Sequence, residues 1–196
     1  DKWVEPVKAA HENGVAGSKG WGYKFDADQA HRLVMRSQGT ALSARQMPNA
    51  KVPGRYFSIA RCFRPDVIDA SHLPDFFQVE GIVVEEGLTF RHLIGILKMF
   101  AKEFAGTDKI KLVPCYFPFT EPSVELMAYH NDIGWLELGG AGVFRPEVTQ
   151  PFGLKVPVIA WGLGIDRIAM LNMGVKDIRE MFSQNIDFIR KKEVVY

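Results

Sequence analysis

The pattern of apolar and polar positions predicts one long helix and a hairpin of two strands. Residues 88–105 place apolar side chains on one stripe at helical spacing, and Gly106 follows as a plausible helix end. Residues 55–63 and 76–86 have the composition of strands, and the polar, proline-bearing segment 64–75 lies between them. We therefore expect a hairpin with a long loop, followed by an amphipathic helix.

Shorter segments complete the predicted order of elements. Three strands of an antiparallel meander are predicted at 110–119, 123–130 and 133–138, followed by a glycine run at 139–142. The remaining predictions are short helices at 3–12 and 39–47, a glycine-rich connection at 13–22, a buried strand at 156–162 and a helix at 164–173. Strands interrupted by one long helix favour a mixed, mainly antiparallel α+β domain.

Length and charge limit the classes of protein. The 196 residues are enough for one substantial domain, and the 47% hydrophobic and 24% charged residues are typical of a soluble globular chain. The net charge of +1 means that any nucleic-acid contact must be local or lie on another chain. The absence of a long apolar window excludes a membrane span. The chain begins at Asp1 without a targeting segment, which suggests a piece of a longer protein.

Several common chemistries have no signature in the sequence. Cys62 and Cys115 lie in apolar stretches without CxxC spacing, which favours two buried thiols in a reducing compartment. The five histidines are scattered without an HExxH pattern, and neither a Walker A loop nor GxGxxG occurs. If the protein handles a nucleotide, it does so without either of these phosphate-binding loops.

One strand face in residues 76–80 carries an unusual set of side chains. Alternation places Phe76, Gln78 and Glu80 on the same face. The ring can stack on a planar base, and the amide and carboxylate can hold an ammonium group, so this face predicts a ligand floor. The alternative is an edge strand with a mixed outer face.

Two arginines are candidate phosphate ligands. Arg64 ends a row of small residues on the preceding strand, His72 follows in the loop, and guanidinium binds phosphate oxygens in a bidentate manner. Arg167 follows Gly162 and Gly164 at a strand-to-helix junction, where glycine allows a ligand to approach the backbone closely. The alternatives are a surface ion pair for Arg64 and an incidental arginine in a helix capped by Asp166.

These residues together resemble a known family. Arg64 and Asp66, followed by His72, Phe76 and Glu80, resemble motif 2 of the class II aminoacyl-tRNA synthetases, and residues 162–167 resemble motif 3. Residues 116–123 resemble the phenylalanine-pocket signature of the phenylalanyl-tRNA synthetase alpha subunit, and residues 135–147 fit its archaeal and eukaryotic-cytosolic type. The resemblance runs from about residue 11 to the end of the chain.

The resemblance implies a fold and a function. The expected fold is α+β, a class II synthetase-like, mainly antiparallel sheet flanked by helices, with residues 1–196 forming a single catalytic domain without motif 1 and the N-terminal arm. The implied enzyme is a cytoplasmic phenylalanine–tRNA ligase that uses ATP and Mg²⁺. It forms phenylalanyl-adenylate and transfers the amino acid to the acceptor end of tRNA(Phe). The implied partner is the beta subunit, in an (alpha-beta)2 heterotetramer.

The resemblance also assigns the ATP-binding residues. Arg64 would bind the α-phosphate, and His72 would lie near the distal phosphates. Phe76 would stack under adenine, with Asp66 near its amino edge. Arg167 would lie over the other face of adenine and contact the γ-phosphate, so Arg64 and Arg167 are the implied catalytic residues.

The amino-acid side of the site is assigned in the same way. The implied ligands of the ammonium group are Gln78 and Glu80, and the implied neighbours of the substrate ring are Phe117, Phe119 and Ala160. Phe117 and Phe119 are expected to share a strand face with Glu121, and the candidate Mg²⁺-side carboxylates are Glu121 and Glu137.

One position departs from the family pattern. The family places a Thr-His-Thr-like run before the helix near residue 40, and here Gln38 and Thr40 follow Arg36 and Ser37. Gln38 stands where histidine is expected, and an amide forms hydrogen bonds but carries no charge. Two alternatives therefore stay open: a paralogue that activates a related amino acid, and a non-catalytic synthetase-like module that binds an amino acid or a partner.

Overall fold

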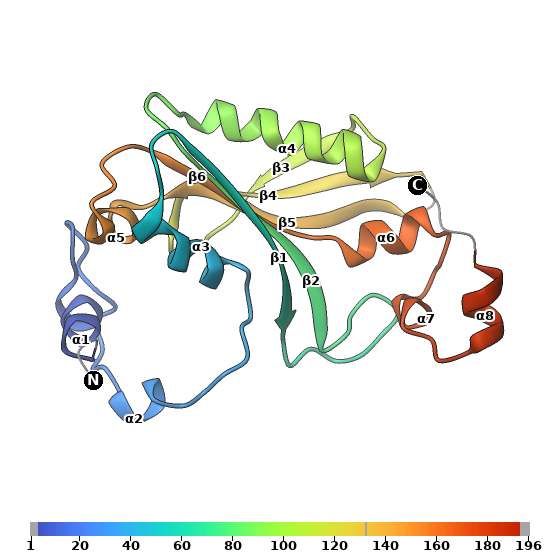
Figure 1. Cartoon of the computed structure of the whole chain (residues 1–196), viewed down its shortest axis with the longest axis horizontal. Helices are drawn as coiled ribbons and strands as arrows, with labels where there is room; N and C mark the ends of the chain where they lie inside the picture. The colour runs from blue at the N-terminus through green and yellow to red at the C-terminus, as the bar shows by residue number, and fades with distance from the viewer. Residues whose placement is uncertain (1–3, 132, 193–196) are drawn as a thin grey trace.

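A six-stranded antiparallel sheet organises the fold in the computed structural model, which describes residues 4–131 and 133–192 (Figure 1). Every neighbouring pair of strands is antiparallel. In spatial order the strands are β1 (Gly54–Phe63), β2 (Asp75–Val84), β6 (Val158–Gly164), β5 (Gly134–Phe144), β4 (Thr120–His130) and β3 (Ile110–Pro114). The predicted fold class and the predicted hairpin of β1 and β2 are confirmed.

Helix α4 (Phe90–Ala105) covers one face of the sheet, as Figure 1 shows. Its buried Leu93 and Leu97 pack with Leu126 of β4 and with Ile159 and Leu163 of β6 in the largest core cluster. A capping box of Thr89 and His92 begins the helix, and Gly106 ends it in a left-handed conformation with φ of 64°. The long helix predicted from periodicity is therefore confirmed.

The other face of the sheet carries α3 (Thr40–Gln46) and the 3₁₀ turn η1 (Met47–Asn49). Met47 packs against Ile82, Val84 and Val158 in a second core cluster. Successive strand residues point to opposite faces, so Val83 belongs to the first cluster while its neighbours belong to the second. This second face is the one that carries the candidate site.

Three short helices follow the last strand: α6 (Asp166–Asn172), α7 (Ile178–Met181) and α8 (Ile186–Lys191). A third core cluster joins Met170, Val175 and Ile178 to Leu73 of the loop between β1 and β2. The remaining elements are α1 (Val4–Asn13), α2 (Ala27–Ala30), α5 (Pro146–Thr149) and the 3₁₀ turn η2 (Gln150–Phe152). Within residues 4–131 and 133–192, no helix has the length and apolar character of a membrane span.

Two sequence predictions about strands β3 and β5 are wrong. The strand predicted at 110–119 ends at Pro114, and residues 115–119 form a connection to β4. The glycine run at 139–142 lies inside β5, although it was expected after the strand.

Both cysteines are free thiols, as predicted, but only Cys62 of the two is buried. Cys115 is half-buried, in the connection between β3 and β4.

Candidate active site

The floor of the main cavity is a patch of sheet that lacks large side chains. The strand register places Glu80 of β2 opposite Gly162 of β6, then Gly140 of β5, then Glu125 of β4. In the adjacent row, Ala160 lies opposite Gly142. Small residues at these central positions leave a cavity of about 280 Å³ above the sheet.

The glycines of this floor are required by side chains that lie directly over them. A Cβ atom at Gly140 would lie 2.3 Å from Cζ of Phe117. One at Gly162 would lie 2.3 Å from Nε2 of Gln78 and 2.8 Å from Oε2 of Glu80. Each glycine therefore makes room for a side chain that lines the cavity.

A β-bulge in β5 brings a carboxylate onto the same floor. Leu126 pairs with Gly139 and Met127 pairs with Glu137, so Leu138 is the extra residue. The bulge places Glu137 and Gly140 on the cavity side while Leu138 stays in the core. Gly139 has φ of 139°, and a Cβ there would lie 2.4 Å from the carbonyl oxygen of Gly162, so only glycine fits.

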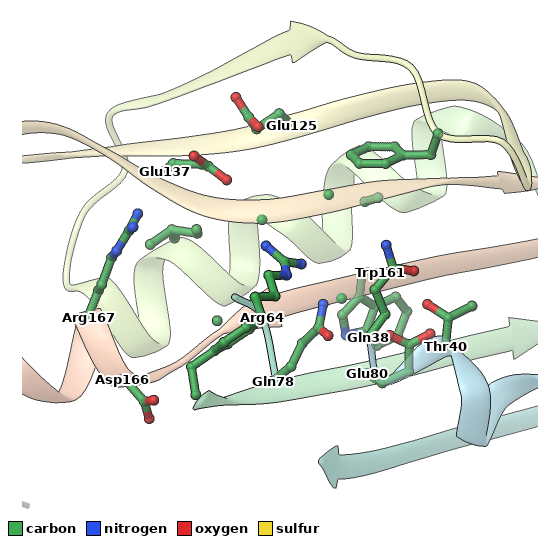
Figure 2. A pocket seen from close by; sticks show the side chains of 18 of the residues that line it. Gln38, Thr40, Arg64, Gln78, Glu80, Glu125, Glu137, Trp161, Asp166 and Arg167 are labelled. Carbon is green, nitrogen blue, oxygen red and sulfur yellow. The ribbon is translucent and has the colours of Figure 1, made fainter. Parts of the chain in front are cut away.

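The structure brings almost all of the predicted site residues to this cavity (Figure 2). Its lining includes Gln38, Thr40, Arg64, Asp66, His72, Phe76, Gln78, Glu80, Phe117, Phe119, Glu137, Ala160 and Arg167. The exception is Glu121, which is exposed and lies outside the lining. Its expected shared face with the two phenylalanines is wrong, because residues 115–119 are not a strand and the register shifts between Thr120 and Ser123.

Glu125 lines the cavity beside Glu137, and the sequence reasoning missed it. Burial raises the pKa of Glu125, and the negative charge of Glu137 raises it further. The signal was present, because Glu125 alternates with buried apolar residues in the strand that pairs with the Glu137 strand. The two carboxylates that line this part of the cavity are therefore Glu125 and Glu137, and Glu121 is not among its lining residues.

Glu80 is a buried carboxylate with one unused oxygen. Its side chain belongs to a residue that is 2% exposed, and the Ser43 hydroxyl donates to Oε1 at 2.9 Å. Oε2 has no hydrogen-bond partner in the described part of the chain. Burial raises the pKa of Glu80 to about 7, against the opposing effect of hydroxyl hydrogen bonds from Ser43 and Thr40. A cationic ligand would satisfy this oxygen.

Gln78 presents the donor end of its amide to the cavity. The backbone N–H of Gly39 donates to Oε1 of Gln78 at 2.9 Å, which assigns the oxygen to that side. Nε2 is the atom that lies over Gly162. The predicted role of Gln78 as an ammonium ligand is therefore less suitable than contact with a carboxylate or phosphate oxygen.

The two arginines come from different segments and hold different contacts (Figure 2). The guanidinium of exposed Arg64 lies 4.8 Å from the ring centroid of Phe76, a cation–π contact. Arg167, in the first turn of α6, places Nη2 3.0 Å from Nε2 of His72. Neither arginine forms an ion pair with a carboxylate in the described residues, so both can bind an anion.

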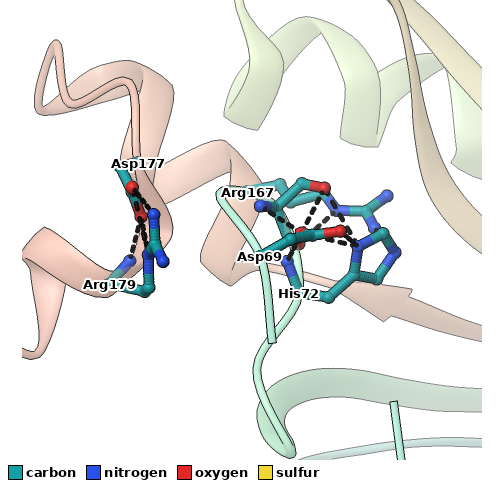
Figure 3. A network of polar contacts seen from close by, with 6 residues as sticks. Asp69, His72, Arg167, Asp177 and Arg179 are labelled. Atoms are coloured by element: carbon teal, nitrogen blue, oxygen red, sulfur yellow. Dashed lines mark hydrogen bonds and ion pairs between the residues drawn. The ribbon is translucent and has the colours of Figure 1, made fainter. Parts of the chain in front are cut away.

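A short polar network orients Arg167 (Figure 3). Guanidinium only donates, so Nε2 of His72 accepts from it, and the His72 proton lies on Nδ1 and is donated to Asp69 at 2.9 Å. Hydrogen bonds from the Ser71 backbone and from His72 hold the pKa of Asp69 well below its usual range. The nearby ion pair Asp177–Arg179 shares no drawn hydrogen bond with this network, although its charges interact with that of Asp69.

The apolar end of the cavity is formed by phenylalanine rings. The rings of Phe117 and Phe119 have centroids 6.3 Å apart and an interplanar angle of 23°. Phe119 also makes an edge-to-face contact with Phe144, at 6.3 Å and 71°. With Ala160 and Gly142 as the floor, this end fits an aromatic or large apolar side chain.

Comparisons with known proteins agree with this architecture. Residues 7–192 match the family described as tRNA synthetases class II core domain (F). The chain therefore belongs to the class II tRNA synthetase core-domain family. A solved structure, pyrrolysyl-tRNA synthetase from Desulfitobacterium hafniense, aligns with a TM-score of 0.56 and 22% identity over 74% of this chain and 52% of that chain. That likeness supports the fold alone.

Curated relatives narrow the comparison. The chain is 54% identical to the phenylalanine–tRNA ligase alpha subunit of Thermococcus gammatolerans, over 100% of this chain and 40% of that protein. It is 55% identical to the protein of the same name in Pyrococcus horikoshii, over 98% of this chain and 39% of that protein. The corresponding values for the protein of Borreliella burgdorferi are 56%, 95% and 35%. The chain thus spans two fifths or less of the length of these relatives.

Proposed function

We propose that the chain is the catalytic domain, residues 1–196, of a phenylalanine–tRNA ligase alpha subunit, which activates phenylalanine with ATP. The observation that carries the proposal is the position of buried Glu80 in a cavity that also holds an apolar aromatic end and two arginines. Within residues 4–131 and 133–192, one Glu80 oxygen has no hydrogen-bond partner and neither arginine has a carboxylate partner. The relatives of 54–56% identity carry the same activity in their names.

Phenylalanine fits the polar and apolar parts of the cavity together. Its ring would occupy the end formed by Phe117, Phe119 and Ala160, and its ammonium group would bind Oε2 of Glu80. The amide N–H of Gln78 would donate to the substrate carboxylate. Gln38 and Thr40 line the same side, where an uncharged amide replaces the family's histidine.

ATP would occupy the side of the cavity that holds Asp66, His72 and Phe76. Adenine would stack on the ring of Phe76. The Arg64 guanidinium would then leave its cation–π contact with that ring and bind the α-phosphate. Arg167 would cover the other face of adenine and contact the γ-phosphate, with His72 near the distal phosphates.

The carboxylates opposite the arginines fit a divalent cation. Glu125 and Glu137 lie side by side, and a cation between them would relieve the charge repulsion that raises the pKa of Glu125. Mg²⁺ bound there would neutralise phosphate charge as it develops.

The reaction needs no nucleophilic side chain. The phenylalanine carboxylate attacks the α-phosphorus of ATP, the bond to the β-phosphate oxygen breaks, and pyrophosphate leaves. The protein positions both reactants, and the guanidinium groups of Arg64 and Arg167 stabilise the phosphate charge in the transition state. The 2′- or 3′-hydroxyl of the tRNA terminal ribose then takes the aminoacyl group and AMP leaves.

The remaining parts of the proposal concern the assembly. The named relatives are alpha subunits, which supports a beta subunit as partner. The proposed assembly is an (alpha-beta)2 heterotetramer in the cytoplasm. The acceptor end of tRNA(Phe) is the proposed second substrate. Because this chain has a net charge of only +1, much of the contact with tRNA would be made by other parts of the assembly.

Pyrophosphate exchange tested with each of the twenty amino acids decides between phenylalanine and the alternatives. We expect exchange with phenylalanine, and Arg64→Ala and Arg167→Ala should each lower its rate by about 100-fold or more. Arg179→Ala is the matched control, since Arg179 pairs with Asp177 outside the cavity lining, and should keep the rate. Exchange with another amino acid alone would establish the paralogue. ATP binding without exchange, even with the beta subunit present, would support the non-catalytic module.

A further inference from the structure

Glu80 forms part of the wall between two cavities. It lines the main cavity and also a second cavity of about 490 Å³ between α3 and the outer strand β1. Ser43 and Ser58 line only the second cavity, whereas Gly162 lines only the main one. The carboxylate of Glu80 is therefore approached by different groups from its two sides.

The two oxygens of this carboxylate are not equivalent. The hydroxyl of Ser43, a residue that is 5% exposed, donates to Oε1 at 2.9 Å from the side of α3. Oε2 lies toward Gly162, where a Cβ would be 2.8 Å away, and among the described residues it has no hydrogen-bond partner. On the remaining side, a Cβ at Gly39 would lie 2.9 Å from Cβ of Glu80. The Ser43 hydrogen bond thus fixes the orientation in which Oε2 faces the main cavity.

We propose that Ser43 is a positioning residue that aims the free oxygen of Glu80 at the ammonium group of the amino-acid substrate. The inference rests on the proposed function, because it assigns the ammonium group to Glu80. Ser43 acts from behind the carboxylate and does not touch the substrate itself, since it does not line the main cavity.

The hydrogen bond also favours the ionised carboxylate that an ammonium ligand needs. The groups around Glu80 are the hydroxyls of Thr40 and Ser43 from α3, the amide of Gln78, Ser58 across the strand pair and the backbone of Gly162. Cys62 of β1 is a titratable neighbour whose pKa is raised by burial, so its thiol stays neutral, and Arg55 and Tyr56 of β1 line the second cavity with Glu80. Loss of the Ser43 hydroxyl raises the pKa of Glu80 further, and ammonium binding then requires a higher pH.

Ser43→Ala tests the proposal, with Ser58→Ala as the matched control. Ser58 lies directly opposite Glu80 in the strand register and lines the same second cavity, whereas it is Ser43 that donates to Oε1 of Glu80. Isothermal titration is carried out from pH 6 to pH 9 with two probes. The first is phenylalanine, and the second is 3-phenylpropanoate, which keeps the ring and the carboxylate but lacks the ammonium group.

We expect Ser43→Ala to weaken phenylalanine binding by about 10-fold at pH 7, to move its pH midpoint upward and to leave 3-phenylpropanoate unchanged. Ser58→Ala should keep the wild-type values for both probes. Ser43→Thr, which retains a hydroxyl, should restore the pH midpoint, and this readout does not depend on equal stability of the variants.

The outcomes separate this inference from the proposed function. If the wild-type chain binds phenylalanine but Ser43→Ala binds it with the same affinity and pH midpoint, Ser43 does not position Glu80. Equal weakening of both probes would make the role of Ser43 purely structural and overturn the proposal as well. If the wild-type protein with its beta subunit neither binds phenylalanine nor exchanges pyrophosphate with it, the proposed function itself is wrong.

Discussion

At the residue scale, ionised Glu80 lowers the stability of the folded chain. Its pKa is about 7 in the fold, compared with an ordinary value of 4.5, because burial disfavours the charged form. The folded state thus binds this proton more tightly than the unfolded state does. The stabilisation of the folded state that comes from protonated Glu80 is fully present below pH 4.5, and it is lost as the pH rises through about 7.

Glu80→Gln should therefore stabilise the chain at alkaline pH. We expect the free energy of unfolding at pH 8 to rise by about 3 kcal/mol relative to wild type, with the difference vanishing near pH 4. Urea unfolding at a series of pH values measures it. Glu103→Gln, at an exposed position of α4, is the control and should show no such pH-dependent gain. A gain that is the same at every pH would contradict the assignment to the buried charge.

The absence of a side chain at Gly140 determines the shape of the apolar end of the cavity. A methyl group at this position would overlap the ring of Phe117, so Gly140→Ala must displace the ring from the apolar end of the cavity. We expect the Kd for phenylalanine to rise by about 10-fold or more, since a displaced ring loses contact area and edge-to-face geometry.

Gly95→Ala is the matched control for this change. Gly95 lies within α4, and a Cβ there would meet no atom within 4 Å. This variant should gain up to ~1 kcal/mol of stability from helix propensity and leave the Kd for phenylalanine unchanged. Equal Kd values for the two variants would show that Phe117 does not contact the substrate.

At the element scale, the parts predicted well are those with an uninterrupted period. Helix α4 and the hairpin of β1 and β2 follow regular spacing, and alternation along β2 places Gln78 and Glu80 on one face as expected. The resemblance added Phe117 and Phe119, which line the cavity even though the strand that was expected to carry them ends at Pro114.

The failures occur where tertiary contacts override that period. The bulge at Leu138 changes which β5 residues face the cavity, and no local sequence pattern predicts this bulge. The same strand contains glycines that look like a turn, because their positions are set by side chains from other segments, such as Phe117 over Gly140. Register between strands also decides which carboxylate faces the cavity, so the alternation around Glu125 did not by itself distinguish it from Glu121.

At the scale of the whole molecule, the loop between β1 and β2 is anchored to the C-terminal helices. Leu73 packs in the cluster of Met170, Val175 and Ile178, and the backbone N–H of Ile178 donates to the carbonyl of Ala70 at 2.9 Å. The same loop carries Asp69 and His72, which orient Arg167. The side of the cavity that holds His72 and Arg167 is thus supported by a core cluster separate from the one under α4.

Leu73→Ala and Leu97→Ala should therefore have different consequences. Leu97 is fully buried under α4, and its truncation should cost about 2–5 kcal/mol of stability while leaving the KM for ATP unchanged. Leu73 is half-buried, and its truncation should cost only about 1 kcal/mol but raise the KM for ATP several-fold. Chemical denaturation and pyrophosphate exchange at varied ATP concentration measure the two effects. If both variants change the KM for ATP in proportion to their lost stability, the loop anchor has no specific role, and the two cores act on the site only through global unfolding.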